Sequence, residues 1–314
     1  MLINLLPEFL SVIDADEPEA AYARYREAHR PVLDAYWRNY VLDPDSAQAQ
    51  KVVLDALSAK RDDLRAVMAS HNLEAIAEDA STAAAELLQL DRPADVYLMV
   101  GMGAANAGEL VIDGRGAAFI CVEHFTGRPN AETYGMGLSP ELIPVWVAHE
   151  LAHVVRYTSP TSAGEIRRLV EDNAGYYDYW ATGSRATLRE LLVNEGLAVH
   201  AAQQVAPGFA AADYFGYARR QYNRLREMES LLRRITGPEL DFRGLGLRLR
   251  YLTGGMSPSA RLINGRVLPE RAGYYLGWRM ADAIVRELGI AAALRASAED
   301  ITAAEEASRG TLSA

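Results

Sequence analysis

The sequence has little of three things that mark whole classes of protein: cysteine, excess positive charge and long hydrophobic runs. Cys121 is the only cysteine among 314 residues. This excludes an intrachain disulfide and a cysteine-based zinc site, and we expect Cys121 to be a buried strand residue. The formal net charge is −10. It argues against a nucleic-acid partner, because a domain that binds nucleic acid carries a basic surface.

No segment approaches the roughly 18 uncharged apolar residues that a membrane-spanning helix needs, so we expect no membrane contact. The N-terminal stretch MLINLLPEFLSVIDADEPEA has no basic segment and turns acidic by Asp14. A secretory signal would begin with basic residues and end in small ones. Half of the residues are hydrophobic and 24% are charged, as is usual for globular proteins. We therefore expect a cytoplasmic protein.

The pattern of apolar residues predicts an α+β protein that is mostly α-helical, with a small β-sheet. Residues 1–90 are rich in Ala, Leu, Glu and Arg at helical spacing, which predicts a helical N-terminal region. After Asp91-Arg92-Pro93, residues 91–314 read as one domain. Its expected elements are strands at about 96–101 and 117–125, helices at about 140–157 and 185–204, and a helical C-terminal part over 206–314. We expect Gly101–Gly116 to be a connection.

The stretch VWVAHELAHVVR, residues 145–156, carries the strongest functional signal. His149 and His153 are four residues apart, which places both imidazoles on one face of a helix, where they can bind one metal ion. Glu150 follows the first histidine, as the general base does in the H-E-x-x-H motif of zinc hydrolases. Apolar residues lie all round this helix, so it should be buried, and buried ionisable groups need partners. The sequence therefore predicts a zinc site.

A catalytic zinc ion usually takes three protein ligands, so a third one must lie elsewhere in the chain. Glu195 is the only charged residue on the apolar face of the helix predicted at 185–204, which favours it as the third ligand. An ion pair between Glu195 and an arginine such as Arg156 is the alternative. The other downstream candidates are Glu165, Glu171, Asp172, Glu190 and His200.

The two motifs HELAH (149–153) and NEGLA (194–198) resemble those of the gluzincin superfamily of zinc metallopeptidases. More closely, residues 92–289 are similar to a bacterial family of predicted zinc-dependent proteases. The resemblance implies His149, His153 and Glu195 as zinc ligands and Glu150 as the base. It also implies an edge strand at 117–125 packed on the zinc-binding helix, and a C-terminal helix that opens with a motif like Ala272–Gly277.

The residues that would complete the site are less sharply indicated. Tyr274 or Tyr275, in the family-like motif, would bring a hydroxyl toward the oxyanion, although both could be core aromatics. Arg279 could hold a substrate carboxylate, although such arginines are more often solvated or paired at the surface. An edge strand beside the zinc could accept an extended peptide by strand addition.

The predicted function is a zinc-dependent hydrolase of peptide bonds, with Zn²⁺ as cofactor and a peptide or protein as substrate. Two alternatives stay open. One is a zinc-stabilised, non-catalytic peptide-binding or regulatory protein, and the other is a zinc hydrolase of a non-peptide amide. The presence of Glu150 favours catalysis, because a binding protein has no need of the base. The sequence leaves the oligomeric state undetermined.

Overall fold

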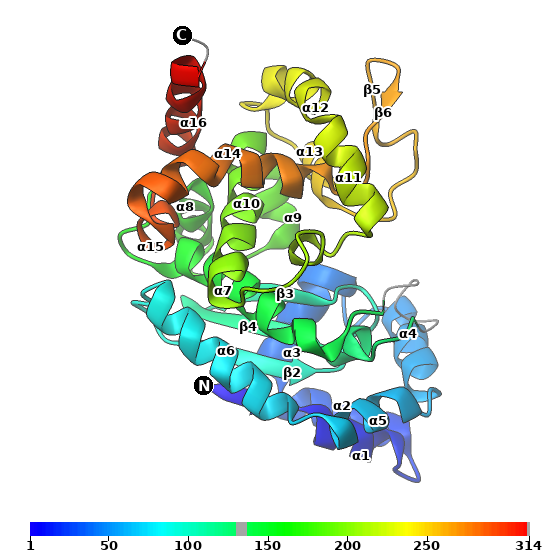
Figure 1. The fold of residues 1–314 in the computed structure, drawn as a ribbon. Coiled ribbons are helices and arrows are strands. Elements are labelled where there is room, and N and C mark those ends of the chain that lie inside the picture. The colour runs from blue at the N-terminus through cyan, green and yellow to red at the C-terminus, as the bar shows by residue number, and fades with distance from the viewer. Residues whose placement is uncertain (130–136, 313–314) are drawn as a thin grey trace.

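The computed structural model describes residues 1–129 and 137–312 (Figure 1). The loop expected around Pro129-Asn130 lies partly outside these residues. The N-terminal elements are β1 (Leu2–Asn4), α1 (Leu6–Ile13), α2 (Pro18–Ala28), α3 (Arg30–Tyr36), the π-helical turn η1 (Trp37–Val41), α4 (Ala47–Leu57), α5 (Asp62–Ser70) and α6 (Leu73–Leu87). These elements cover most of the region in which the sequence predicts helices.

The central segment holds the rest of the main sheet and the first long buried helix. Its elements are β2 (Ala94–Met99), β3 (Ala107–Ile112), β4 (Arg115–Cys121), the 3₁₀ turns η2 (Val122–Phe125) and η4 (Pro140–Leu142), and α7 (Ile143–Thr158). The chain is α+β and mostly helical, as the sequence predicts.

The C-terminal half is almost entirely helical. It comprises α8 (Glu165–Asp172), α9 (Tyr179–Arg185), α10 (Leu188–Val205), η5 (Asp213–Phe215), α11 (Arg219–Glu227), α12 (Glu229–Thr236), η6 (Gly237–Glu239), α13 (Leu245–Leu252), the short hairpin β5 (Leu262–Ile263) and β6 (Arg266–Val267), α14 (Ala272–Leu288), α15 (Ile290–Ala293) and α16 (Ala298–Leu312).

The main sheet has the strand order β1-β2-β4-β3. β1 pairs with β2 and β2 with β4 in parallel, whereas β3 runs antiparallel to β4. Asp113 and Gly114 join β3 to β4, and both have positive φ angles of 52° and 73°. Such angles are typical of a type I′ hairpin turn, for which Asp-Gly is a preferred pair.

The structure corrects the position of the edge strand. The predicted strand at 117–125 is an interior strand, β4, which starts at Arg115 and ends at Cys121, and residues 122–125 form a 3₁₀ turn. The edge strand on this side is β3, which lies within the stretch expected to be a connection. The sequence reading missed the Asp113-Gly114 hairpin signal and gave the glycines and alanines before it too much weight. Cys121 is buried in its strand.

Helices cover both faces of the sheet (Figure 1). α7 packs on β3 and β4, and α6 lies beside α7 over β1 and β2. α3 packs on β3 from the opposite face, where Tyr36 meets the ring of Phe119 edge-on. The buried apolar side chains form one continuous cluster that reaches from Leu5 to Ile301. The N-terminal helices therefore share their core with the rest of the chain.

α10 packs against α7, and α14 crosses α10 on its other side. The crossing is made by Gly196 and Gly277: a Cβ atom on Gly196 would overlap the backbone of Gly277, and one on Gly277 would overlap the backbone of Leu192. Glycine permits this approach of two helix backbones because it has no side chain. Gly196 is the neighbour of Glu195, so the crossing brings the start of α14 to the same region.

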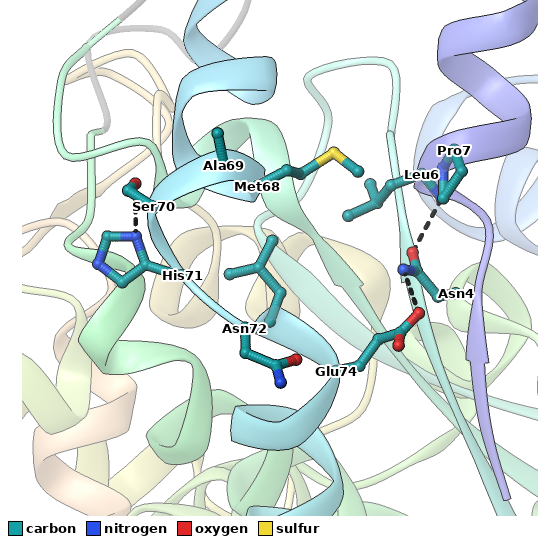
Figure 2. Close-up of a pocket in the computed structure, with 10 residues that line it drawn as sticks. Asn4, Leu6, Pro7, Met68, Ala69, Ser70, His71, Asn72 and Glu74 are labelled. Atoms are coloured by element: carbon teal, nitrogen blue, oxygen red, sulfur yellow. Dashed lines mark hydrogen bonds between the residues drawn. The ribbon is translucent and has the colours of Figure 1, made fainter.

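A surface hollow of about 510 Å³ opens between α1 and the turn that joins α5 to α6 (Figure 2). The side chain of Asn4 connects the two sides of this hollow. It accepts a hydrogen bond from the Leu6 amide at 3.0 Å and donates one to Glu74 at 2.7 Å. None of the site residues expected from the sequence lines this hollow. Among the described helices, none combines the length and the apolar character needed to span a membrane.

Candidate metal centre

The helix that carries HELAH, α7, is surrounded by protein. The Ser139 hydroxyl accepts a hydrogen bond from the amide of Glu141 and so caps the 3₁₀ turn that leads into α7. His149, Glu150 and His153 are only 2–3% exposed. Burial of three ionisable side chains is costly unless they bind one another or a cation.

Three of the predicted ligand atoms converge. Nε2 of His149 lies 3.3 Å from Oε2 of Glu195, and Nε2 of His153 lies 3.5 Å from the same oxygen. The rings of His149 and His153 meet edge-on, 4.9 Å apart between centroids. Both imidazoles therefore turn the same nitrogen toward one carboxylate on the neighbouring helix.

These separations fit a zinc ion. Zinc–ligand bonds of about 2.0–2.1 Å at tetrahedral angles place the donor atoms about 3.4 Å apart. The two histidine-to-glutamate distances, 3.3 and 3.5 Å, bracket that value. Two imidazoles and one carboxylate are a usual donor set for a catalytic zinc ion with an open fourth position. The residues present therefore fit the metal that the motif implies.

The other downstream candidates are bound elsewhere. Glu190 forms a buried ion pair with Arg156 at 2.8 Å, so Arg156 is not the partner of Glu195. His200 lies 2.9 Å from the carbonyl oxygen of Trp278 and stacks on that indole. The remaining acids pair with arginines: Glu165 with Arg243, Glu171 with Arg167, and Asp172 with Arg185. Of the candidates weighed from the sequence, only Glu195 faces the two histidines.

The electrostatics show a site that attracts positive charge. Although burial raises the pKa of Glu195, the two histidines hold it well below its usual value. Burial lowers the pKa of His153, but Glu195 and Glu109 outweigh it and raise that pKa to about 9. Burial raises the pKa of Glu150 well above its usual value, and Glu109 and Glu195 add to this effect. A divalent cation would offset the crowding of carboxylates.

The two tyrosines expected near the site point in different directions. The ring of Tyr274 stacks on that of His149, with 6.1 Å between centroids, so the structure brings Tyr274 to the metal centre. The hydroxyl of Tyr275 donates to Glu229 at 2.8 Å, and Arg279 pairs with the same carboxylate at 3.1 Å. The structure thus does not bring Tyr275 and Arg279 to the metal centre. They lie about one helical turn apart on a different face of α14 from Tyr274.

Arg271 is a site residue that the sequence reading missed. It precedes α14 with a φ of 52°, a left-handed conformation that is uncommon for a side chain other than glycine. Its guanidinium lies 4.3 Å from the centroid of the Tyr274 ring. Within residues 1–129 and 137–312, no carboxylate forms an ion pair with it. The sequence feature that could have indicated Arg271 is its position directly before the Ala272–Gly277 motif.

Glu109, on the edge strand β3, is the second residue missed. Ligand atoms of Glu109, Glu150 and His153 all lie within 4.8 Å of one another, and all three residues are buried. The Glu109 carboxylate accepts from the hydroxyls of Tyr157 and Tyr40, each at 2.9 Å. Glu109 is the one acid in the apolar run AGELVI. If that run had been predicted as a strand, this acid would have indicated a site residue.

Comparison with known proteins gives one finding. Residues 176–303 match a family described as "Predicted Zn-dependent protease (DUF2268)". The matched segment contains Glu195 and Tyr274 and begins after the helix that bears the two histidines. Neither the curated proteins nor the solved structures include a match to this chain.

Proposed function

We propose that this chain, in which residues 176–303 match the predicted Zn-dependent proteases, is a zinc-dependent hydrolase of peptide bonds of the gluzincin type. His149, His153 and Glu195 hold the metal, and Glu150 is the general base. The observation that carries the proposal is the convergence of the two Nε2 atoms on Oε2 of Glu195, at tetrahedral separations. The expected partner is a peptide or protein, and the expected location is the cytoplasm.

Glu150 is suited to moving a proton. It follows His149 in α7, so its carboxylate lies beside the metal ligands, and its buried position raises its pKa. This carboxylate takes the proton of the attacking water and passes it to the leaving amine. A zinc ion held by the three ligands would polarise that water and the substrate carbonyl.

In this proposal Tyr274 and Arg271 stabilise the negative charge that develops on the carbonyl oxygen. Burial raises the pKa of Tyr274 well above its usual value, so its hydroxyl keeps its proton and remains a hydrogen-bond donor. The guanidinium of Arg271 keeps its charge at any pH of interest and is held against the Tyr274 ring. Both groups come from the start of α14, opposite the HELAH helix.

The experiment that tests this function combines metal analysis with one substitution. Purified protein should carry about one zinc ion per chain. The variant Glu150→Gln should keep the zinc and lose peptide hydrolysis by roughly 10²- to 10⁴-fold. Glu141→Gln is the matched control, because Glu141 is exposed in the turn before α7, and its activity should equal that of the wild type.

Three outcomes would contradict the proposal at different points. Protein that contains no zinc after gentle purification, and binds none when it is added, would exclude the metal centre. Full activity in Glu150→Gln would exclude Glu150 as the base. Bound zinc without hydrolysis of any peptide would favour a zinc-stabilised binding protein or a hydrolase of a non-peptide amide.

A further inference from the structure

The outer side of the edge strand β3 is the surface on which an extended peptide could add to the sheet. In an antiparallel pair, alternate residues turn both backbone groups toward the partner strand or away from it. The amide of Cys121 donates to the carbonyl of Asn106 at 2.9 Å, so Asn106 faces β4. Ala107, Glu109 and Val111 therefore turn their backbone N–H and C=O groups outward.

Two of these three outward positions are already bound. The Tyr40 hydroxyl accepts from the amide of Glu109 at 3.2 Å and lies 2.9 Å from its carbonyl oxygen. The amide of Tyr177 donates to the carbonyl of Val111 at 3.0 Å. Tyr40 comes from the π-helical turn η1, and Tyr177 from the segment between α8 and α9. The C-terminal end of β3 is thus closed to an added strand.

The N-terminal end of β3 is different. In the part of the chain that the structure describes, no residue binds the outward backbone groups of Ala107. The side-chain amide nitrogen of Asn106, next to it, is buried without a hydrogen-bond partner. Ala107 is itself buried. An unbound buried donor beside backbone groups that no described residue binds suits the carbonyl of an added peptide.

The direction of that peptide follows from charge. The closed end of β3 carries the buried carboxylate of Glu109, near Glu150 and His153. An antiparallel peptide would turn its N-terminal ammonium toward this carboxylate, whereas a parallel one would bring a C-terminal carboxylate to it. Opposite charges attract and like charges repel strongly in a buried site. The antiparallel direction is therefore the favourable one.

Resting on the proposed function, we infer that the enzyme is an aminopeptidase, because Tyr40 and Tyr177 leave room for only a short stretch on the N-terminal side of the cleaved bond. The substrate lies along β3 from Ala107 toward earlier residues, with its free ammonium near Glu109. Hydrolysis adds water across the peptide bond, so the released fragment carries a new carboxyl group and the remainder a new amino group. Short N-terminal fragments are the expected product.

The test compares three versions of one peptide with zinc-loaded, full-length protein. The free peptide should be shortened from its N-terminus, as followed by mass spectrometry. The N-acetylated peptide should be cleaved at least about tenfold more slowly, because its ammonium is lost and its N-terminal side is longer. The C-amidated peptide should behave like the free one. Cleavage of free and acetylated peptides at the same internal bonds and rates would overturn the inference and leave the proposed function intact.

Binding gives a readout that does not depend on turnover. The Glu150→Gln protein should bind a fluorescent peptide with a free N-terminus at least about tenfold more tightly than its acetylated form, measured by anisotropy. Equal affinities would contradict the inference. If zinc-loaded wild type cleaves none of the three peptides, the proposed function itself falls, which separates the two failures.

One substitution tests directly whether the contact of Tyr40 with Glu109 limits the substrate. Tyr40→Phe removes the hydroxyl that binds Glu109 but keeps the ring that packs on Phe119. Cleavage of the acetylated peptide relative to the free one should rise severalfold. Tyr22→Phe is the control, because its hydroxyl accepts from Trp37 elsewhere in the N-terminal region, and the ratio should not change. An unchanged ratio in Tyr40→Phe would show that this contact does not limit the substrate.

Discussion

At the scale of single residues, two glutamates of α10 differ in role because they have different partners. Glu190 and Glu195 are both buried on α10, only five positions apart. Glu190 receives two hydrogen bonds from Arg156, whereas the partners of Glu195 among the described residues are the two histidines. A carboxylate that lacks a fixed cation in a buried site is the one that can bind a metal ion.

The first prediction contrasts these two glutamates. Glu195→Ala should lower zinc affinity by at least about tenfold to a hundredfold and leave the fold largely intact, because it removes a proposed ligand but leaves no arginine buried without its partner. Glu190→Ala should keep zinc affinity in the folded protein. It should lower the free energy of unfolding by about 3–5 kcal/mol, because Arg156 would be buried without its partner. Zinc titration and urea unfolding measure the two effects. Loss of zinc in Glu190→Ala alone would show that the wrong carboxylate was chosen.

At the scale of elements, the site depends on how closely three helices approach. α7 carries the two histidines and the proposed base, α10 carries the proposed third ligand, and α14 brings Tyr274 over His149. The crossing of α10 and α14 at Gly196 and Gly277 sets this distance. Side chains at the crossing would push α14 away, and with it the tyrosine and arginine at its start.

The second prediction places an added methyl group at this crossing. Gly277→Ala should lower the free energy of unfolding by more than about 1–3 kcal/mol, the usual cost of overpacking, because the methyl would meet backbone that cannot yield easily. It should also lower activity by moving Tyr274. Gly246→Ala in α13 is the control: its Cβ would meet open space, and alanine should stabilise that helix by about 0.5–1 kcal/mol. Thermal unfolding of both variants makes the comparison, and equal stabilities would contradict it.

At the scale of the whole molecule, residues 1–90 and the rest of the chain share one core. β1 pairs with β2, with Leu2 opposite Val96, and α6 packs along α7. Tyr40 also reaches the edge strand beside the metal centre. The division at about residue 90 therefore stays a prediction about the sequence, whereas the packing makes the N-terminal region part of the structure that holds α7.

The third prediction removes residues 1–90. The remaining chain should lose cooperative unfolding and aggregate, because the deletion uncovers β2 and one side of α7. Circular dichroism during heating, together with the yield of soluble protein, measures this. A soluble fragment 91–314 that unfolds cooperatively and binds zinc would instead establish that segment as an independent domain.

Much of the site could be predicted from the sequence because helical geometry is local. The four-residue spacing of His149 and His153 places both rings on one face of any α-helix, and the phase of α10 turns Glu195 inward. The same reasoning gave the fold class, since periodicity distinguishes helices from strands. Only the tertiary fold could show that the two faces meet, and the structure brings Nε2 of both histidines to within 3.3 and 3.5 Å of Glu195.

Tertiary structure alone decided which strand forms the edge and which way each side chain of α14 points. Strand order depends on pairing between segments far apart in the sequence, and local periodicity carries no information on it. Tyr274 and Tyr275 are neighbours in sequence, yet about 100° of helical rotation sends one to His149 and the other to Glu229. Glu109 and Arg271 reach the candidate metal centre through the β3–β4 hairpin and the glycine crossing. The sequence by itself determined the chemistry available, and packing determined which side chains take part in it.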